Sequence, residues 1–391
     1  MRSTAILTLL LLPLLTACGE EKASNEASIK IGDSFAYTSF ARFGEPYRNG
    51  WQLAVQEVNA NGGVCLREDD CRKLDVTSVD HGATPDQALR TVEGLVERDE
   101  VDVLAGTILG NVTNAIGSYA GHREIPLVTL WSSVLAEEGP QNPFMFSIMP
   151  FEPHALASAD LAATMPIKRW ALIGPDMAWG RSGNALFKKR LKELRPDVEI
   201  VTEQWPAVSN FNSSAEFSAL RHAQPEGIFS SLFGSDLFAF IREGHRLNFF
   251  EGKTIIGTEL TQAAHLNVIG GEIKQGKWYG TGYPAAHINT PEHTKFYEAY
   301  KARYNEPPEL YALAGYSLYK VIAAAIQEAG SLDKEKVRTA LQGIVVETPM
   351  GELEVFAHNH RADFGVWLGK VADGDMPKWE YYPARKYIGK N

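Results

Sequence analysis

Two turns in the stretch from residue 101 to residue 133 carry residue types suited to binding a small molecule. The first runs from Gly106 to Asn111 and the second is Trp131-Ser132-Ser133, and each follows a short hydrophobic run typical of a buried strand. Asn111 is a suitable N-cap for a following amphipathic helix. In a parallel α/β sheet, ligands bind beyond the carboxyl ends of the strands, where helix N-termini present N–H groups. We therefore expect the two turns to form half of a binding site.

The sequence contains two incomplete patterns of an enzyme or a metal site and lacks a third. Residues 271–277, GEIKQGK, resemble a phosphate-binding loop, but Trp278 stands where a magnesium-ligating Ser or Thr is required. His358 and His360 form an H-x-H pair without a third ligand, which favours a surface hairpin. The chain has no G-x-S-x-G elbow. We therefore expect no catalysis, no metal and no cofactor.

The first 18 residues, MRSTAILTLLLLPLLTAC, place one Arg before an apolar run that is too short to span a membrane. We predict a signal peptide over residues 1–17. Its end resembles a bacterial lipobox, which implies that Cys18 is lipidated and that residues 18–28 form a polar tether. The alternative is simple cleavage, with Cys18 incidental.

The two remaining cysteines, Cys65 and Cys71, are separated by LREDD in an expected loop. An even pair this close in an exported protein favours a local disulfide. A metal site is the alternative, but the loop would supply only carboxylates as further ligands.

The composition is that of a globular protein with room for two domains. The chain has 391 residues, of which 45% are hydrophobic and 22% charged, and its net charge is −10. The charge argues against nucleic acid and against an anionic membrane face as the main partner.

The order of elements that must position the turns is that of an α/β protein. Strands at 29–35, 74–80, 101–105 and 125–130 alternate with helices, which requires a parallel sheet with right-handed crossovers. Thr84-Pro85-Asp86-Gln87 begins one of these helices with an N-cap and a Pro at the first helical position. The pattern then restarts, with strands at 170–174, 199–205, 227–233 and 254–257 and helices between them. Two doubly wound units imply two lobes that face each other.

The last third adds elements beyond those that one lobe can hold. We expect a strand at 277–283, helices at 291–304, 310–329 and 332–342, and a hairpin-like pair of strands at 351–356 and 365–371. Some of this material must return to the first lobe.

Several phrases, in order, resemble one known family across about residues 29 to 380. They are IKIGDSF, FGEPYRNGWQLAVQEVNANGGV, IPLVT, DMAWGRSGNALFKKRLKEL, YKARYNEPPELYALAGYSLY and TPMGELEVFAHNHRAD. They resemble the leucine/isoleucine/valine-binding and amide-binding branch of type I periplasmic binding proteins. The resemblance implies two Rossmann-like lobes joined by a three-segment hinge near 146–150, 277–283 and 356–361. The expected lobes are 29–148 plus 281–356 and 149–280 plus 357–391.

The resemblance also implies a set of ligand-binding residues. The family has a hydroxyl residue where this chain has Gly110, so the backbone N–H groups of Gly110 and Asn111 remain there to hold an anion. The second turn supplies Trp131, Ser132 and Ser133, of which Ser133 stands at a ligand-binding position. The remaining expected contacts are three aromatic residues and one acid: Phe43, Trp179, Phe233 and Glu259. The acid, Glu259, would select an ammonium or another donor group of the ligand. Taken singly, each aromatic residue is more often core than pocket, and Glu259 could be a surface carboxylate.

The implied function is capture of a small organic solute for delivery to an ABC permease. The solute would be a branched-chain or aromatic amino acid or an amide-like compound, held between aromatic faces. We expect a monomer on the periplasmic or outer cell surface, attached to the membrane only through its lipid. Two alternatives stay open, a ligand-sensing module for a signalling partner and an envelope scaffold without a ligand.

Overall fold

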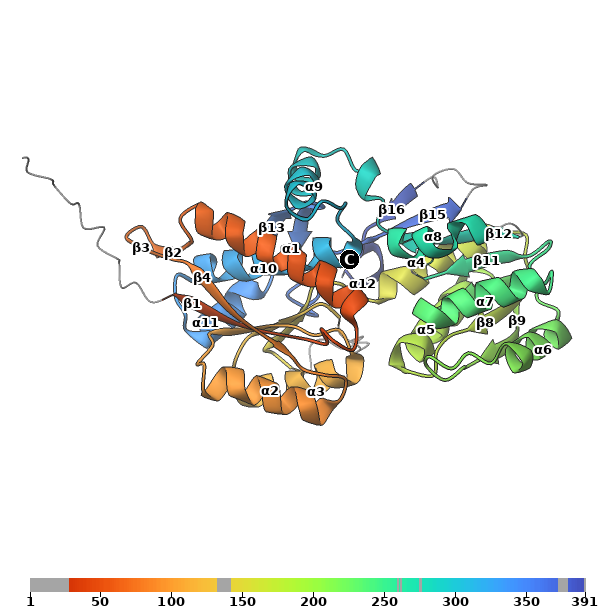
Figure 1. The fold of residues 1–391 in the computed structure, drawn as a ribbon, viewed down its shortest axis with the longest axis horizontal. Helices are drawn as coiled ribbons and strands as arrows, with labels where there is room; N and C mark the ends of the chain where they lie inside the picture. Colours follow the sequence, from red (N-terminus) through yellow and green to blue (C-terminus); the bar gives the residue numbers. More distant parts are fainter. Residues whose placement is uncertain are drawn as a thin grey trace, which may run out of the picture.

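The chain forms two α/β lobes that lie side by side (Figure 1). The computed structural model describes residues 28–131, 142–258, 260, 262–273, 276–371 and 379–389. The expected signal peptide, Cys18 and nearly all of the tether lie outside this part of the chain. Within it, no helix has the length and apolar character that crossing a membrane requires.

The first lobe is built on a five-stranded parallel sheet with the strand order β4-β1-β5-β6-β7. Its strands are β1 (Ile29–Phe35), β4 (Leu74–Asp80), β5 (Val103–Gly106), β6 (Leu127–Thr129) and β7 (Met145–Ser147). The connecting helices are α1 (Ala41–Ala60), α2 (Pro85–Glu97) and α3 (Gly110–His122). The Thr84 side chain accepts a hydrogen bond from the Gln87 N–H, which confirms the predicted start of α2.

The second lobe is built on a seven-stranded mixed sheet with the order β16-β15-β12-β11-β10-β8-β9. Five strands run parallel: β8 (Arg169–Ile173), β9 (Glu199–Gln204), β10 (Gly227–Ser230), β11 (Thr254–Gly257) and β12 (Lys277–Gly282). Antiparallel β15 (Val366–Val371) and β16 (Trp379–Tyr382) complete the edge. The helices of this lobe are α4 (Glu152–Ala163), α5 (Ala178–Leu194), α6 (Ser213–Ala223), α7 (Gly234–Arg246) and α8 (Ala263–Ile269), with the 3-10 turn η1 (Gly270–Glu272) after α8.

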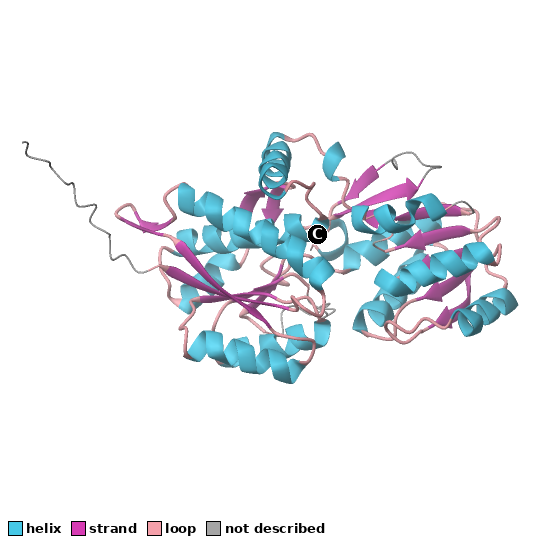
Figure 2. Cartoon of the chain, viewed as in Figure 1, coloured by secondary structure: helices cyan, strands magenta, loops and turns pink. Residues whose placement is uncertain are grey.

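Three helices from the last third pack on the first lobe, as part of the chain was expected to do (Figure 2). They are α9 (Pro291–Tyr304), α10 (Leu310–Ala329) and α11 (Lys334–Leu341). Helix α10 crosses α1 so closely that a Cβ added at Gly50 would lie 2.0 Å from the Ala312 carbonyl oxygen. Smaller elements are β2 (Val64–Arg67), β3 (Asp70–Arg72), β13 (Val345–Thr348), β14 (Gly351–Glu354), η2 (Ala285–His287) and α12 (Arg385–Ile388).

The predicted disulfide between Cys65 and Cys71 is present. It joins β2 to β3, which pair as a short antiparallel ribbon rather than forming an irregular loop. The bridge therefore fixes a hairpin at the end of the first lobe remote from the second lobe (Figure 1).

The predicted hairpin of strands 351–356 and 365–371 is wrong. Strand β14 pairs with β13, whereas β15 lies in the second sheet between β12 and β16. Alternation of apolar and polar residues indicates that a segment is extended but does not say which strand it pairs with. Here the chain leaves the first lobe between the two strands.

Two smaller predictions about side chains are also wrong. His360 is not on a surface hairpin, because it is 2% exposed and stacks on Phe146 with ring centroids 4.1 Å apart. Asn111 is not the N-cap of α3, because the helix already begins at Gly110 and Leu109 takes the cap position without a side-chain hydrogen bond.

The chain crosses between the lobes three times, after β7, after β12 and after β14. The first and third crossings are bonded together, because Ser147 N–H donates to the His360 carbonyl and Ala362 N–H donates to the Ser147 carbonyl. Beside them, the Arg361 guanidinium and the Glu152 carboxylate form a buried ion pair. The hinge is therefore built from paired backbone and one internal salt bridge.

Candidate functional site

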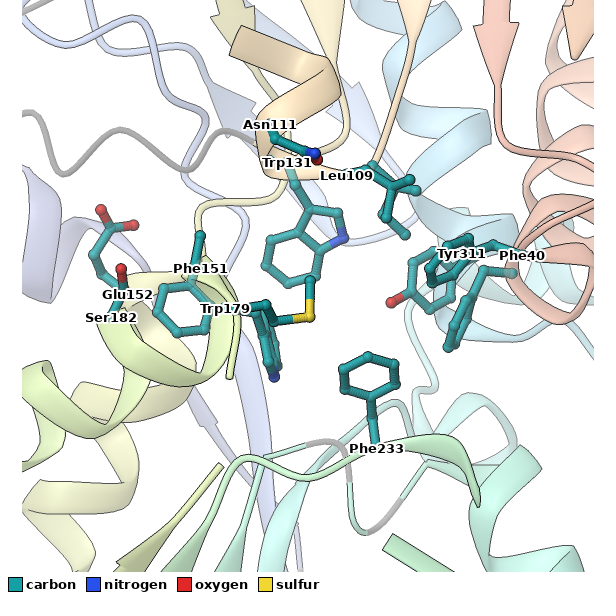
Figure 3. A pocket seen from close by; sticks show the side chains of 15 residues that line it. Phe40, Leu109, Asn111, Trp131, Phe151, Glu152, Trp179, Ser182, Phe233 and Tyr311 are labelled. Carbon is teal, nitrogen blue, oxygen red and sulfur yellow. The ribbon is translucent and has the colours of Figure 1, made fainter. Parts of the chain in front are cut away.

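A cavity of about 380 Å³ lies between the two lobes (Figure 3). Both lobes contribute to it, mainly through loops after strands and the first turns of helices. The described residues that line it are Phe40, Phe43, Ile108, Leu109, Gly110, Asn111, Trp131, Phe151, Glu152, Met177, Ala178, Trp179, Ser182, Phe233 and Tyr311.

Six of the residues expected to bind a ligand line this one cavity. They come from α1, the turns after β5 and β6, the first turn of α5 and the loop after β10, and they are Phe43, Gly110, Asn111, Trp131, Trp179 and Phe233. Ser132, Ser133 and Glu259 lie outside the described residues. Contact of any of these residues with a ligand stays a prediction.

Trp179 is at the centre of an aromatic cluster on one wall (Figure 3). Its ring centroid lies 4.5 Å from that of Phe151 and 5.3 Å from that of Trp131, both in edge-to-face geometry. Its indole Nε1–H donates to the Ser231 carbonyl at 2.8 Å. This bond fixes the ring orientation, and because Trp131 follows β6 of the first sheet, the cluster also joins the lobes.

The opposite wall consists of rings from the first lobe. Phe43 of α1 packs on Tyr311 of α10 with ring centroids 4.8 Å apart, and Phe40 lies 6.2 Å from Phe43. Phe233 reaches toward these rings from the second lobe (Figure 3). A ligand in the cavity would therefore meet aromatic surface on both sides.

Three helices begin at the cavity. The cap residues of α3, α5 and α7 are Leu109, Met177 and Phe233; all three line the cavity, and none has a side chain that caps its helix. Each helix N-terminus carries a partial positive charge. In α7 the carboxylate of Asp236, in the first turn, offsets this charge. The first turns of α3 and α5 contain no acidic residue, so these two helix ends favour an anionic group.

The ionisable groups beside the cavity add little net charge. Glu152 is the one carboxylate among the described lining residues, and it is paired with Arg361. Burial lowers the pKa of His154 to about 3, so this residue, which packs on Trp131 and bonds through Nδ1 to Thr281 Oγ1 at 2.9 Å, is neutral. The described wall is therefore apolar and close to neutral, apart from the helix ends.

The sequence did not single out nine of the lining residues, although two of them, Ile108 and Leu109, lie within the first predicted turn. The nine are Phe40, Ile108, Leu109, Phe151, Glu152, Met177, Ala178, Ser182 and Tyr311. Ile108 and Leu109 lie inside the first predicted turn, and Met177 and Ala178 directly precede Trp179, so their position after a strand is the signal that could have found them. Tyr311 offered no such signal, because it begins a helix that returns from the far end of the chain. Phe151 follows the first crossing, and its position depends on how that crossing folds.

Metal binding finds no support in the described residues. No group of three or more His, Cys, Asp and Glu side chains among them is placed to hold a metal ion. His358 Nε2 lies 3.0 Å from the Ile388 carbonyl oxygen, and His360 Nε2 bonds to the Gln342 side chain at 2.8 Å, so the two histidines have separate partners.

Comparison with known proteins points to one family. The family model described as periplasmic binding protein matches residues 28–375. The leucine-, isoleucine-, valine-, threonine- and alanine-binding protein of Pseudomonas aeruginosa is 22% identical over 315 residues, which are 80% of this chain and 81% of that protein. A Leu/Ile/Val-binding protein homologue of Brucella abortus is 22% identical over 374 residues, covering 89% of this chain and 90% of that protein.

Solved structures share the fold over most of both chains. A solute-binding protein of an ABC transporter from R. palustris, in complex with benzoate, has a TM-score of 0.78 at 19% identity and covers 91% of this chain and 96% of its own. The branched-chain amino acid transporter substrate-binding protein of Streptococcus pneumoniae, in complex with isoleucine, has a TM-score of 0.78 at 18% identity and covers 91% of this chain and all of its own.

Proposed function

This chain belongs to the periplasmic binding protein family, and we propose that it captures a small organic solute between its lobes outside the cytoplasm and delivers it to an ABC permease. The observation that carries the proposal is the cavity between the lobes, walled by aromatic rings from both. Such a cavity closes around a ligand when the lobes rotate about a hinge. The relatives named for amino acid binding and the fold neighbour with bound benzoate support a solute of this size.

The proposed solute is a branched-chain or aromatic amino acid, or an amide-like compound. The six described contacts would hold it through ring faces and helix N-termini. We assign Ser132 and Ser133 to hydrogen bonding in the second turn and Glu259 to a positive or donor group of the solute. The family is a class of solute-binding proteins, and the proposed role requires no catalytic step.

The proposed anchor is a lipid on Cys18, which would tether a monomer to the membrane through residues 18–28. We propose that residues 29–148 plus 281–356 move as one lobe and that residues 149–280 plus 357–391 move as the other. The membership of the two sheets supports this division, because β15 and β16 lie in the second sheet and β1 to β7 do not.

A thermal-shift screen of the purified protein tests the proposal. A solute at about 1,000 times its Kd stabilises a one-site receptor by about 4 kcal/mol, which is a clear rise in Tm. The panel should include branched-chain and aromatic amino acids, their amides and small aromatic acids. A ligand that raises the Tm of wild type more than that of Trp179→Ala supports the site, because a tenfold loss of affinity lowers the stabilisation from about 4 to about 2.7 kcal/mol. A complete absence of shifts across the panel would contradict the proposed function.

A further inference from the structure

A contact between a cation and a ring joins the two lobes. The guanidinium carbon of Arg42, in the first turn of α1, lies 5.6 Å from the ring centroid of Phe238 in α7. Helix α1 belongs to the first lobe and α7 to the second. Among the cation–ring contacts of the described residues, this one alone crosses between the lobes; the others, such as that of Arg48 with Tyr37 at 3.7 Å, lie within one lobe. Movement of the lobes relative to each other therefore makes or breaks it.

Both partners are close in sequence to residues that line the cavity. Arg42 directly precedes Phe43, and Phe238 lies in the helix whose cap residue is Phe233. Neither Arg42 nor Phe238 is among the described residues that line the cavity. The contact therefore joins the two walls without taking up space that a solute would fill.

Each partner is also held by its own lobe. The Phe238 ring packs against the core of the second lobe and lies edge-on to the His265 ring, with centroids 5.7 Å apart. Burial raises the pKa of Glu309, the cap residue of α10 in the first lobe, and the positive charge of Arg42 opposes this rise. The Arg42 side chain is thus attracted to its own lobe while its guanidinium reaches a ring that is fixed in the other.

The contact lies on the side of the cavity away from the first and third crossings. Phe151 and Glu152 follow the first crossing and lie on one side of the cavity, whereas Phe40, two residues before Arg42, lies on the other (Figure 3). The contact of Trp131 with Trp179, which also joins the lobes, is beside Phe151. Displacement in a hinge rotation grows with distance from the hinge. Opening of the lobes therefore separates Arg42 from Phe238 before it separates the two tryptophans.

From these features we infer that Arg42 is a positioning residue for solute binding, because its guanidinium holds the Phe238 ring and stabilises the lobe arrangement that encloses the cavity. The inference rests on the proposed function, since holding the lobes together affects binding only if a solute is captured between them. The apparent affinity of a solute that binds the closed arrangement is proportional to the fraction of molecules that are closed. A cation–ring contact at a half-exposed site raises the ratio of closed to open molecules by about twofold to fivefold.

Double electron–electron resonance on the purified, solute-free protein tests the inference. Spin labels on Ser118→Cys and Ser218→Cys report the separation of the lobes, because these exposed positions lie on α3 and α6. We expect Arg42→Gln and Phe238→Leu each to lower the ratio of short to long distances by about twofold to fivefold. The double variant should show no larger change than the stronger single variant, because both substitutions remove the same contact.

Two further variants separate this role from a general loss of stability. Arg42→Lys keeps a cation that can lie over the ring, so it should retain most of the short distances. Arg48→Gln is the matched control, because it removes a guanidinium from the same helix whose ring partner, Tyr37, lies in the same lobe. Unchanged distances in both Arg42→Gln and Phe238→Leu would overturn the inference, and so would equal changes in Arg42→Gln and Arg48→Gln.

Calorimetric titration with isoleucine and phenylalanine as probes gives a second readout. For each probe that binds, Arg42→Gln should raise the Kd by up to the factor by which it lowers the ratio of short to long distances. A raised Kd with unchanged distances would overturn the inference, because Arg42 would then act on the solute directly. Binding of neither probe, with no thermal shift in the wider panel, would contradict the proposed function, whereas the distances measured without solute test the Arg42–Phe238 contact by themselves.

Discussion

Replacing Trp179 with alanine should weaken solute binding by at least tenfold and leave the fold intact. The indole lines the cavity while its Nε1–H is held by the Ser231 carbonyl at 2.8 Å. A bound ring that covers about 60 Å² of this indole gains about 1.5 kcal/mol at roughly 25 cal/mol per Å², which is slightly more than a factor of ten in Kd. The alanine variant lacks this contribution to the free energy of binding, because the contact exists only when the solute is bound.

The same substitution also lowers the stability of the ligand-free protein, and this effect must be separated from the loss of affinity. The indole makes edge-to-face contacts with Phe151 and Trp131, each of about 0.5–1.5 kcal/mol, and one hydrogen bond of about 1 kcal/mol. We therefore expect the free energy of unfolding to fall by about 2–4 kcal/mol, measured by urea denaturation without ligand.

Calorimetry at a temperature where Trp179→Ala is fully folded then reports binding alone. Trp179→Phe keeps a ring and should lose less affinity than the alanine variant. Trp205→Ala removes an indole of intermediate exposure that stacks with Arg181 outside the cavity, and its affinity should match wild type. Equal affinity in wild type and Trp179→Ala would refute the assignment of this wall to the binding site.

Four further predictions concern stability and selectivity. Reduction of the Cys65–Cys71 bridge should lower the free energy of unfolding by about 2 kcal/mol without changing Kd, because the bridge closes a short hairpin; melting with and without reductant measures it. Arg361→Met should cost about 3–5 kcal/mol in urea denaturation by leaving Glu152 buried without a partner, and Glu152→Gln in the same chain should recover most of the loss. The pKa of His154 is about 3 in the folded state, against an ordinary value of 6.5, so between these two pH values only the unfolded chain binds this proton. The free energy of unfolding therefore falls as the pH falls through this window. His154→Gln should reduce the slope of the free energy of unfolding against pH by up to about 1.4 kcal/mol per pH unit. Glu259→Gln should weaken binding of an α-amino acid more than that of its analogue without the amine, as paired titrations would show, and equal effects on the two would count against an ammonium contact.

Local sequence signals predicted the individual elements well. Helices α9 and α10 have the predicted bounds, because Thr290-Pro291 starts one and Gly330, with a φ of 57°, ends the other. The fold class also followed from the alternation of strands and helices. Strand pairing in the last third of the chain could not be predicted from this alternation, because the partners of β14 and β15 depend on where the chain crosses between the lobes. That crossing is set by tertiary contacts such as the Ser147–Ala362 hydrogen bond.

The candidate site was predictable where its residues follow strands. The turns after β5 and β6 reach the same edge of the first sheet, so Gly110 and Trp131 could be placed from the order of elements. Trp179 and Phe233 follow β8 and β10 in the second lobe, and the resemblance to a known family implied their role. Tyr311 could not, because it comes from a helix that returns to the first lobe from the far end of the chain. The Glu152–Arg361 pair also has no sequence signal, since it joins residues 209 positions apart.

The most direct test of the central claim is ¹⁹F NMR of protein labelled with 5-fluorotryptophan, titrated with a solute that raises the Tm. The chain has eight tryptophans, of which Trp131 and Trp179 line the cavity. Trp131→Phe and Trp179→Phe assign their resonances. Binding between the lobes predicts that these two resonances shift most while that of Trp170, buried in the core of the second lobe, stays in place. A stabilising solute that leaves both cavity resonances unchanged would contradict binding between the lobes.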